Sequence, residues 1–294
     1  MHGVGIGDPR RSQVANDTVA VLHPGEMGAA VGARLRDKGL RVLWAGDDRS
    51  AATRARAQEA GLEDAGTLAN ALAQSTVALA ICPPHAALDL AREVARAGYR
   101  GAYIDANAVA PDTSRQAARI VESAGATFTD GGIIGPPPGG GVRTRLYLSG
   151  GDARRLATLL SSGPLAAIAL DGPVGAASAL KVCYAAWNKN SSLLVACIRA
   201  LAAHEGVEAA LLEEWRGSQP DAIERVERFR RNARKAWRWV GEMEESAATF
   251  AAAGLPDGFS QAGAETCRRL ESFKDASPAP PLEELLGALE GGAR

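Results

Sequence analysis

Lysine is scarce in this sequence, and one lysine is placed where it could transfer a proton. Arginine is the usual cation, whereas lysine occurs only at positions 38, 181, 189, 235 and 274. No proline interrupts Val174 to Gln219, and on a helix there Lys181, Tyr184 and Asn188 would share one face. A buried lysine is costly unless it is paired or used. Lys181, with Tyr184 beside it, is therefore our candidate for acid–base chemistry. The alternative is a lysine whose stem packs while its ammonium reaches water.

A strand, a tight turn and a helix are predicted near the N-terminus, followed by a second strand that ends near Ala45. The turn reads His-Pro-Gly-Glu-Met-Gly, and its candidate cofactor-binding residues are Pro24, Gly25, Glu26, Met27 and Gly28. Glycines in such a turn admit a pyrophosphate, which the helix N-terminus binds through its N–H groups. His23 stands where the GxGxxG fingerprint has its first glycine, so an ordinary strand-to-helix turn is the alternative.

The end of the second strand predicts which dinucleotide would bind. Arg49, Ser50 and Arg54 place two guanidinium groups and a hydroxyl around a helix start, which suits the 2′-phosphate of NADPH. Asp47 and Asp48 could instead bind the ribose hydroxyl of NADH or cap the helix. We favour NADPH over NADH.

Two further strand ends carry polar residues. Cys82 and Pro83 follow the strand predicted from Val77, at the edge where open α/β sheets bind ligands. Asn107 follows the next strand, where its amide could orient a substrate or cap the following helix. Cys82 and His85 have no further ligand cluster nearby, so we predict no metal site.

Glycine and proline crowd the stretch from Phe128 to Gly141. The residues up to Gly135 lead into PPPGGG, a composition that disfavours regular structure. We expect a shaped loop here, and the alternative is a flexible surface crossing.

Composition limits the classes of partner. The 294 residues carry a net charge of -1 and are 46% hydrophobic, which predicts a globular protein with a small-molecule ligand rather than nucleic acid or membrane. The arginines around Trp237 and Trp239 are interpreted as a solvated face, and the tryptophans as core or interface. Four unpatterned cysteines, no signal-peptide core and no run of ~20 apolar residues favour a cytoplasmic protein.

The predicted elements divide the chain into parts. Residues 1–17 read as a flexible extension, residues 18–173 as alternating strands and helices that begin with a dinucleotide-binding pattern, and residues 174–294 as mainly helical. This order of elements is typical of the α/β fold class. The helix beginning near Gly175 would run for ~30 residues, about 45 Å, and its nearly uniform apolar composition predicts burial.

Taken in order, these motifs resemble the β-hydroxyacid dehydrogenase superfamily, which includes 6-phosphogluconate dehydrogenase, 3-hydroxyisobutyrate dehydrogenase and the imine reductases. The resemblance covers the chain from Thr18 to about Leu270, and it is strongest to a bacterial phosphogluconate-dehydrogenase-like branch. The family's GxGxMG falls on residues 23–28, with Met27 kept, and its D-x-S-T-x-x-P falls on residues 105–111, with Asn107 in place of serine.

The other two family motifs also depart from the pattern. The substrate motif D-x-P-V-S-G-G falls on residues 130–136, with Ile134 in place of serine and one glycine kept. The GxGxxxKxxN motif falls on residues 175–184; it retains Lys181, while Ala177 replaces glycine and Tyr184 replaces asparagine.

The resemblance implies an NAD(P)-dependent oxidoreductase that transfers hydride to or from a carbonyl or alcohol, with Lys181 as general acid–base and Asn107 orienting the substrate. It implies an N-terminal Rossmann domain over residues 18–173 followed by an all-helical C-terminal domain over residues 174–294, which binds substrate and forms a homodimer. The implied substrate residues are Ile133, Ile134, Gly135, Asn188 and Trp239. Because the residues that bind a carboxylate are mostly changed, a bulkier or less acidic carbonyl or an imine fits better than a small hydroxyacid. The alternatives are an imine reductase and a non-catalytic NADPH-binding regulatory protein.

Overall fold

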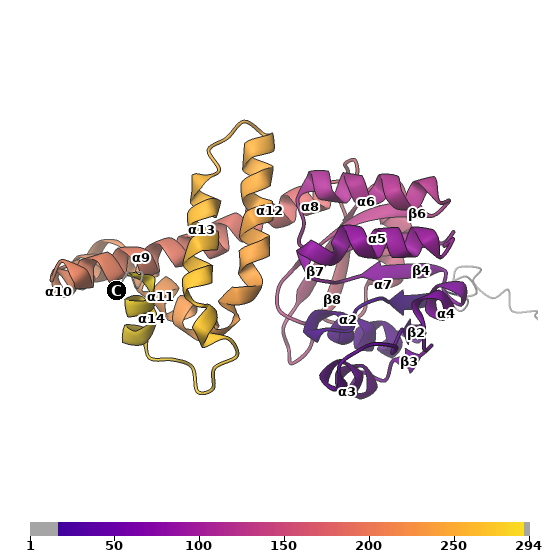
Figure 1. Ribbon diagram of the computed structural model, residues 1–294, viewed down its shortest axis with the longest axis horizontal. Helices are drawn as coiled ribbons and strands as arrows, with labels where there is room; N and C mark the ends of the chain where they lie inside the picture. The colour runs from indigo at the N-terminus through magenta and orange to yellow at the C-terminus, as the bar shows by residue number, and fades with distance from the viewer. Residues whose placement is uncertain (1–16, 291–294) are drawn as a thin grey trace, which may run out of the picture. The chain divides into compact units, whose positions relative to one another are not determined.

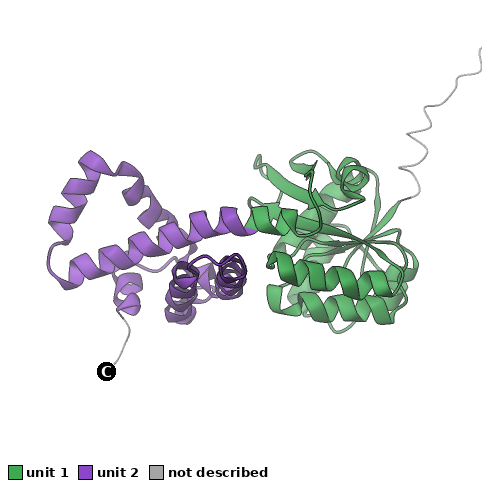
Figure 2. Cartoon of the chain, turned by 90° about the horizontal axis from the view of Figure 1, so that it is seen from above, with its two compact units in different colours: residues 1–181 green, residues 182–294 purple. Residues whose placement is uncertain are grey.

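The computed structural model describes residues 17–290 and divides the chain into two compact units. The first unit runs to Lys181 and the second begins at Val182, so the division falls inside helix α8 (Ala176–Ala185) (Figure 2). It lies eight residues beyond the boundary expected from the sequence. Except for Asp17, the expected N-terminal extension lies outside the described residues.

The described part of the first unit is built on one eight-stranded sheet of order β3-β2-β1-β4-β5-β6-β7-β8 (Figure 1). The strands are β1 (Thr18–Val21), β2 (Arg41–Trp44), β3 (Glu63–Asp64), β4 (Val77–Ala80), β5 (Ala102–Asp105), β6 (Thr127–Ile134), β7 (Thr144–Ser149) and β8 (Leu165–Ala169). Strands β1 to β6 are parallel, β7 is antiparallel to β6, and β8 is parallel to β7. The order reverses between β1 and β4, which is where open α/β sheets bind ligands. The predicted Rossmann fold is confirmed.

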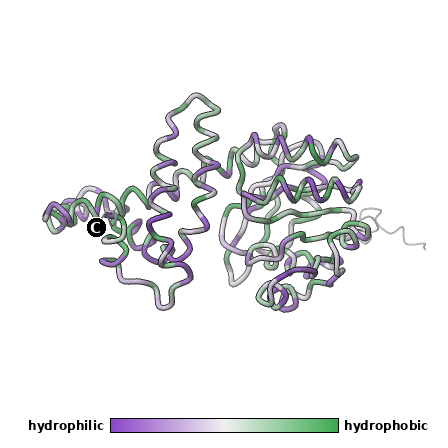
Figure 3. The backbone as a smooth tube through the Cα atoms, viewed as in Figure 1, coloured by the Kyte–Doolittle hydropathy of each residue, from purple (hydrophilic) through white to green (hydrophobic). Residues whose placement is uncertain are grey.

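Helices cover both faces of this sheet. They are α2 (Glu26–Asp37), α3 (Ala51–Glu59), α4 (Leu68–Ala73), η1 (Pro84–Ala86), α5 (Ala87–Arg96), α6 (Pro111–Ser123) and α7 (Ala153–Leu160). Residues of α2, α3 and α7 share one core cluster with the strands, and residues of α4, α5 and α6 share the other. The strands are mostly hydrophobic, whereas α5 and α6 alternate between hydrophobic and hydrophilic residues (Figure 3), as expected for helices with one buried face.

The loop expected from Phe128 to Gly141 is wrong for its first part, because β6 continues to Ile134. Two glycines inside this strand allow close packing rather than a turn. A Cβ on Gly131 would lie 2.9 Å from the Asp105 carbonyl oxygen, and one on Gly132 would lie 2.6 Å from the Ala177 carbonyl oxygen. The irregular segment is limited to residues 135–143, between β6 and β7.

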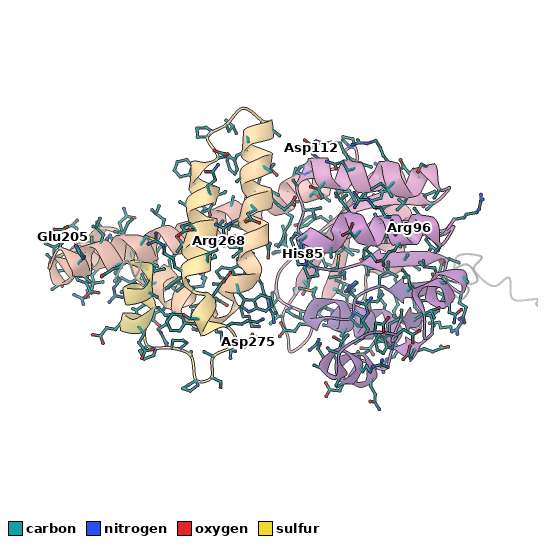
Figure 4. The ribbon with its side chains drawn as sticks, in the orientation of Figure 1. His85, Arg96, Asp112, Glu205, Arg268 and Asp275 are labelled. Atoms are coloured by element: carbon teal, nitrogen blue, oxygen red, sulfur yellow. The ribbon has the colours of Figure 1, made fainter. Side chains whose placement is uncertain are left out.

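The second unit is helical. After the end of α8 it contains η2 (Ala186–Asn190), a π-helical turn, followed by α9 (Ser191–His204), α10 (Glu208–Ser218), α11 (Pro220–Asn232), η3 (Ala233–Arg238), α12 (Trp239–Ala252), α13 (Gly258–Arg269), η4 (Glu271–Phe273) and α14 (Leu282–Leu289). Its core includes Leu193, Phe229, Leu270 and Leu285. Helix α13, which carries Arg268 (Figure 4), packs along α12.

The long helix is confirmed, since α8, η2 and α9 run without interruption from Ala176 to His204. The expectation that it is buried all round is wrong. Trp187 is 64% exposed, Leu194 57% and Leu201 61%, so the helix presents apolar side chains outside the unit's own core.

Candidate functional site

The fingerprint turn joins β1 to α2 and leaves the start of α2 without a side-chain cap. Gly25 is the N-cap residue, and its N–H donates to the His23 carbonyl oxygen at 2.9 Å. A Cβ on Gly28 would lie 2.2 Å from that same oxygen, so only glycine fits there. A Cβ on Gly25 would meet nothing within 4 Å. The turn therefore offers an open backbone surface at a helix N-terminus, which suits a pyrophosphate.

Arg49 reaches from the β2–α3 connection back to this turn. Its Nη1 lies 2.8 Å from Nε2 of His23, and its Nη2 lies 3.5 Å from the Leu22 carbonyl oxygen. Burial, and secondly the charge of Arg49, lowers the pKa of His23 from 6.5 to about 4. The His23 contact was not foreseen from the sequence, where His23 appears only as a departure from the fingerprint.

The other residues of the β2–α3 connection, and Arg54 at the start of α3, contact residues that are near them in the sequence. Ser50 is the N-cap of α3, and its Oγ accepts the Thr53 N–H at 3.3 Å. Arg54 Nε donates to the Arg49 carbonyl oxygen at 3.2 Å, while the side chain is exposed. Asp48, with φ of 57°, is in the left-handed region and is exposed. The structure thus places Arg49 and Ser50 on the β2–α3 connection and Arg54 near the start of α3, with the Ser50 hydroxyl already used as a cap.

The ends of β4 and β5 are joined by Asn107. Its Oδ1 accepts the Cys82 N–H at 2.6 Å, and its own N–H donates to Oδ1 of Asp105 at 3.0 Å. Its Nδ2 is buried and has no hydrogen-bond partner among the described residues. Helix α6 is capped at Ala110, so Asn107 does not cap it. Burial and the nearby Asp105 raise the pKa of the Cys82 thiol to about 12, so Cys82 stays a neutral thiol.

Lys181 lies where α8 packs directly on β6. A Cβ on Gly132 would lie 3.1 Å from the Lys181 Cβ, which shows how closely the helix approaches the strand. Lys181 itself is half-buried. Ile133 and Ile134 are 7% and 3% exposed, so their side chains pack inside the unit.

Asp130, on β6, holds the start of α8 in place. Its Oδ2 accepts the N–H groups of Gly175, Ala177 and Ser178 at 3.0, 2.8 and 3.0 Å, and the Ser149 hydroxyl at 2.8 Å. Its Oδ1 accepts the hydroxyls of Ser114 and Ser178 at 2.8 and 2.5 Å. Asp130 is fully buried, and a carboxylate at a helix N-terminus is favoured by the helix dipole. The sequence analysis assigned Asp130 to the substrate motif but did not predict these hydrogen bonds.

Three predicted residues belong to the second unit. Tyr184 is 43% exposed, and its carbonyl oxygen accepts Nδ2 of Asn188 at 3.0 Å. Trp239 packs under Lys189, whose Nζ lies 5.0 Å from the ring centroid. Lys189 also pairs with Glu242 at 2.5 Å, with both side chains largely buried. The scarcity of lysine was the only sequence signal for this pair.

Two family models match the chain. Residues 18–162 match the NAD binding domain of 6-phosphogluconate dehydrogenase, and residues 202–270 match a domain of unknown function (DUF1932). Together they span most of the chain. No match to a curated protein was found.

Solved structures with a similar fold align over nearly the whole chain. The conserved protein MTH1747, described as having unknown function and structural similarity with 3-hydroxyacid dehydrogenases, is 27% identical; the match covers 87% of this chain and 97% of that one, with a TM-score of 0.67. The 3-hydroxyisobutyrate dehydrogenase of Mycobacterium tuberculosis is 18% identical over 93% and 99%, with a TM-score of 0.72. The imine reductase of Streptomyces aurantiacus is 22% identical over 92% and 99%, with a TM-score of 0.53. The latter two show a shared fold.

Residues 17–290 show neither a cluster of metal-ligating side chains nor a membrane-spanning helix. Among residues 17–290, no three His, Cys, Asp or Glu side chains gather as metal ligands would. No helix in the same range combines the length and apolarity needed to cross a membrane.

Proposed function

We propose that this chain, a member of the superfamily of NAD(P)-dependent oxidoreductases that contains the hydroxyacid dehydrogenases and imine reductases, uses NADPH to reduce a carbonyl group or, in the reverse direction, NADP⁺ to oxidise the corresponding alcohol. The observation that carries the proposal is the position of Lys181, held against β6 at Gly132 on a helix anchored by Asp130. A lysine fixed in this way can act as a general acid–base.

The residues of the first unit fit a nicotinamide dinucleotide. The turn of Pro24, Gly25, Glu26, Met27 and Gly28 would hold the pyrophosphate against the start of α2, where the backbone is open at Gly25. Arg49, with Ser50 beside it and Arg54 near the start of α3, would hold the 2′-phosphate that distinguishes NADPH from NADH. Cys82 and Pro83, at the end of β4, would line the path toward the nicotinamide.

NADPH, when bound, would supply a hydride to the carbonyl carbon. Lys181 then has to deliver a proton to the carbonyl oxygen, and in the oxidation direction it has to accept the proton of the alcohol. Asn107 can orient the substrate through Nδ2, because its Oδ1 is already occupied by the Cys82 N–H. Tyr184, three residues after Lys181, is the candidate to assist the proton transfer.

Each unit carries residues that we propose to contact a substrate. From β6 and the segment after it, Ile133, Ile134 and Gly135 would contribute backbone, because the two isoleucine side chains are buried. Asn188 and Trp239 are the candidates from the helical unit. The Lys189 ammonium over Trp239 restrains that ring.

Lys181→Ala tests the proposal directly. Turnover should fall by about 10²- to 10⁴-fold while NADPH binding changes little. Lys274→Ala is the matched control, because Lys274 is exposed and should leave turnover unchanged. The substrates should include ketones and cyclic imines side by side, since preferential imine turnover would make this an imine reductase. Undiminished turnover in Lys181→Ala would refute the role of Lys181, and NADPH binding without any hydride transfer would favour a regulatory protein.

We also infer that the protein is a cytoplasmic homodimer formed through the helical unit. Helix α9 exposes Leu194, Ile198 and Leu201, which are spaced by four and three residues and so share one face. All four cysteines are free thiols, which supports a reducing compartment. Light scattering should report a dimer for the unaltered chain and a monomer when Leu194 and Leu201 are both changed to glutamate. A monomeric unaltered chain would contradict the inference.

A further inference from the structure

His23 is the side chain that departs most clearly from the dinucleotide fingerprint, and the structure gives it a partner. Its Nε2 lies 2.8 Å from Nη1 of Arg49. A guanidinium group has donors only, so Nε2 must be the acceptor and the imidazole must be neutral, with its proton on Nδ1. The lowering of the His23 pKa to about 4 agrees with a neutral ring at physiological pH.

The pair leaves polar atoms without partners. His23 Nδ1 and Arg49 Nε are buried, and neither has a hydrogen-bond partner among the described residues. Arg49 Nη2 reaches only the Leu22 carbonyl oxygen, at 3.5 Å. Buried donors of this kind are uncommon in native proteins and mark places where a ligand or water completes the bonding. Here both belong to side chains at the ends of β1 and β2.

The other candidate groups, on the β2–α3 connection and at the start of α3, are less able to orient an anion. The Ser50 hydroxyl caps α3, and Arg54 is exposed with its Nε bonded to the Arg49 carbonyl oxygen. Arg49 is therefore the guanidinium group that a side chain from another element holds in place. A long side chain that is already ordered loses less rotamer freedom on binding, so it binds more tightly.

We propose that His23 is a positioning residue for cofactor choice: it accepts a hydrogen bond from Arg49 and thereby holds the guanidinium group ready for the 2′-phosphate of NADPH. This inference rests on the proposed use of a nicotinamide dinucleotide. His23 replaces the first glycine of the fingerprint, and the inference gives this residue a function in selecting NADPH over NADH. Because His23 acts only through Arg49, its removal should affect the phosphorylated cofactor alone.

Fluorescence titrations of the full chain with NADPH and NADH test this assignment. His23→Ala should weaken NADPH binding by about 5- to 10-fold and change NADH binding by less than about 2-fold. His23→Gln should keep most of the affinity, because its amide oxygen can replace Nε2 as acceptor. Arg49→Ala should weaken NADPH binding further, and adding His23→Ala to it should cost nothing more. His204→Ala, on an exposed histidine, is the control.

The outcomes separate the inference from the proposed function. Equal weakening of NADPH and NADH in His23→Ala would mean that His23 shapes the turn itself, which would overturn the inference. Additive effects of the His23 and Arg49 changes would overturn it as well. If the titrations divide as expected but no carbonyl or imine is reduced, the inference stands and the proposed activity fails. Binding of neither cofactor by the unaltered protein would overturn both.

Discussion

Replacing Asp130 by asparagine tests how the helix that carries Lys181 is held. The side chain keeps its size and one carbonyl oxygen but loses its charge. Six hydrogen bonds end on the Asp130 carboxylate, and three of their donors are N–H groups at the start of α8. Asparagine would turn its oxygen toward these N–H groups, which cannot act as acceptors, and its NH₂ toward the hydroxyls of Ser114 and Ser178.

The cost can be worked from this geometry. A hydrogen bond to a charged acceptor contributes about 1.5–3 kcal/mol, compared with about 0.5–1.5 kcal/mol for a neutral one. Four donors meet Oδ2, so weakening each by about 1 kcal/mol gives roughly 4 kcal/mol. The buried charge is itself costly to desolvate, which offsets part of this loss. We expect Asp130→Asn to lower the free energy of unfolding by about 2–4 kcal/mol.

Urea denaturation at pH 7, followed by tryptophan fluorescence and by circular dichroism, measures this change. Asp112→Asn is the matched control, because Asp112 at the start of α6 is exposed and pairs with Arg115 at the surface (Figure 4). Its loss should cost less than about 1 kcal/mol. A loss in Asp130→Asn no larger than in this control would refute the view that the carboxylate anchors α8.

Three further results are expected. Gly132→Ala should push α8 away from β6, because the new Cβ would lie 2.6 Å from a carbonyl oxygen; turnover and thermal midpoint should both fall, and an unchanged midpoint would contradict the packing. Because the pKa of His23 is lowered from 6.5 to about 4, the unfolded chain gains its proton first as the pH falls. Relative to His23→Gln, the protein should lose at most about 3 kcal/mol of stability between pH 6.5 and 4, and parallel pH profiles would contradict this. A thiol reagent at pH 8 should modify exposed Cys183 first, half-buried Cys82 more slowly, and buried Cys267 only on unfolding, since burial raises the pKa of Cys82 and Cys267 to about 12; reaction of Cys267 in the folded protein would contradict its burial.

The sequence was a good guide where local pattern and packing agree. The apolar run before Gly25 predicts β1, and the glycines and alanines that follow predict α2, as the structure shows. The long helix from Ala176 is likewise predicted because proline is absent and helix-forming residues dominate. These features depend on neighbours in the chain, which is the information that a single sequence carries best.

Features that depend on distant residues were missed. Gly131 and Gly132 read as turn residues, but they lie in a strand. A Cβ on Gly131 would meet Asp105 and Ala106 at the end of β5, and one on Gly132 would meet Ala177 of α8. His23 reads as a defect in the fingerprint because Arg49, 26 positions later, cannot be placed beside it by spacing alone. The exposed face of α9 was missed because composition gives the number of apolar residues but does not show which of their side chains other elements bury.

The contacts of Asp130 also limit where the dinucleotide-binding domain can be separated from the helical domain during evolution. The family match to the dinucleotide-binding domain ends at residue 162, yet the N–H groups that satisfy this carboxylate come from residues 175, 177 and 178. A chain ended at the family boundary would keep a buried carboxylate at the centre of the fold without these donors. The first turns of α8 are thus part of the dinucleotide-binding fold, although they begin the helix that enters the second unit. Gene fusions that exchange the helical domain should therefore tolerate a junction after Ser178 and fail with one before Gly175.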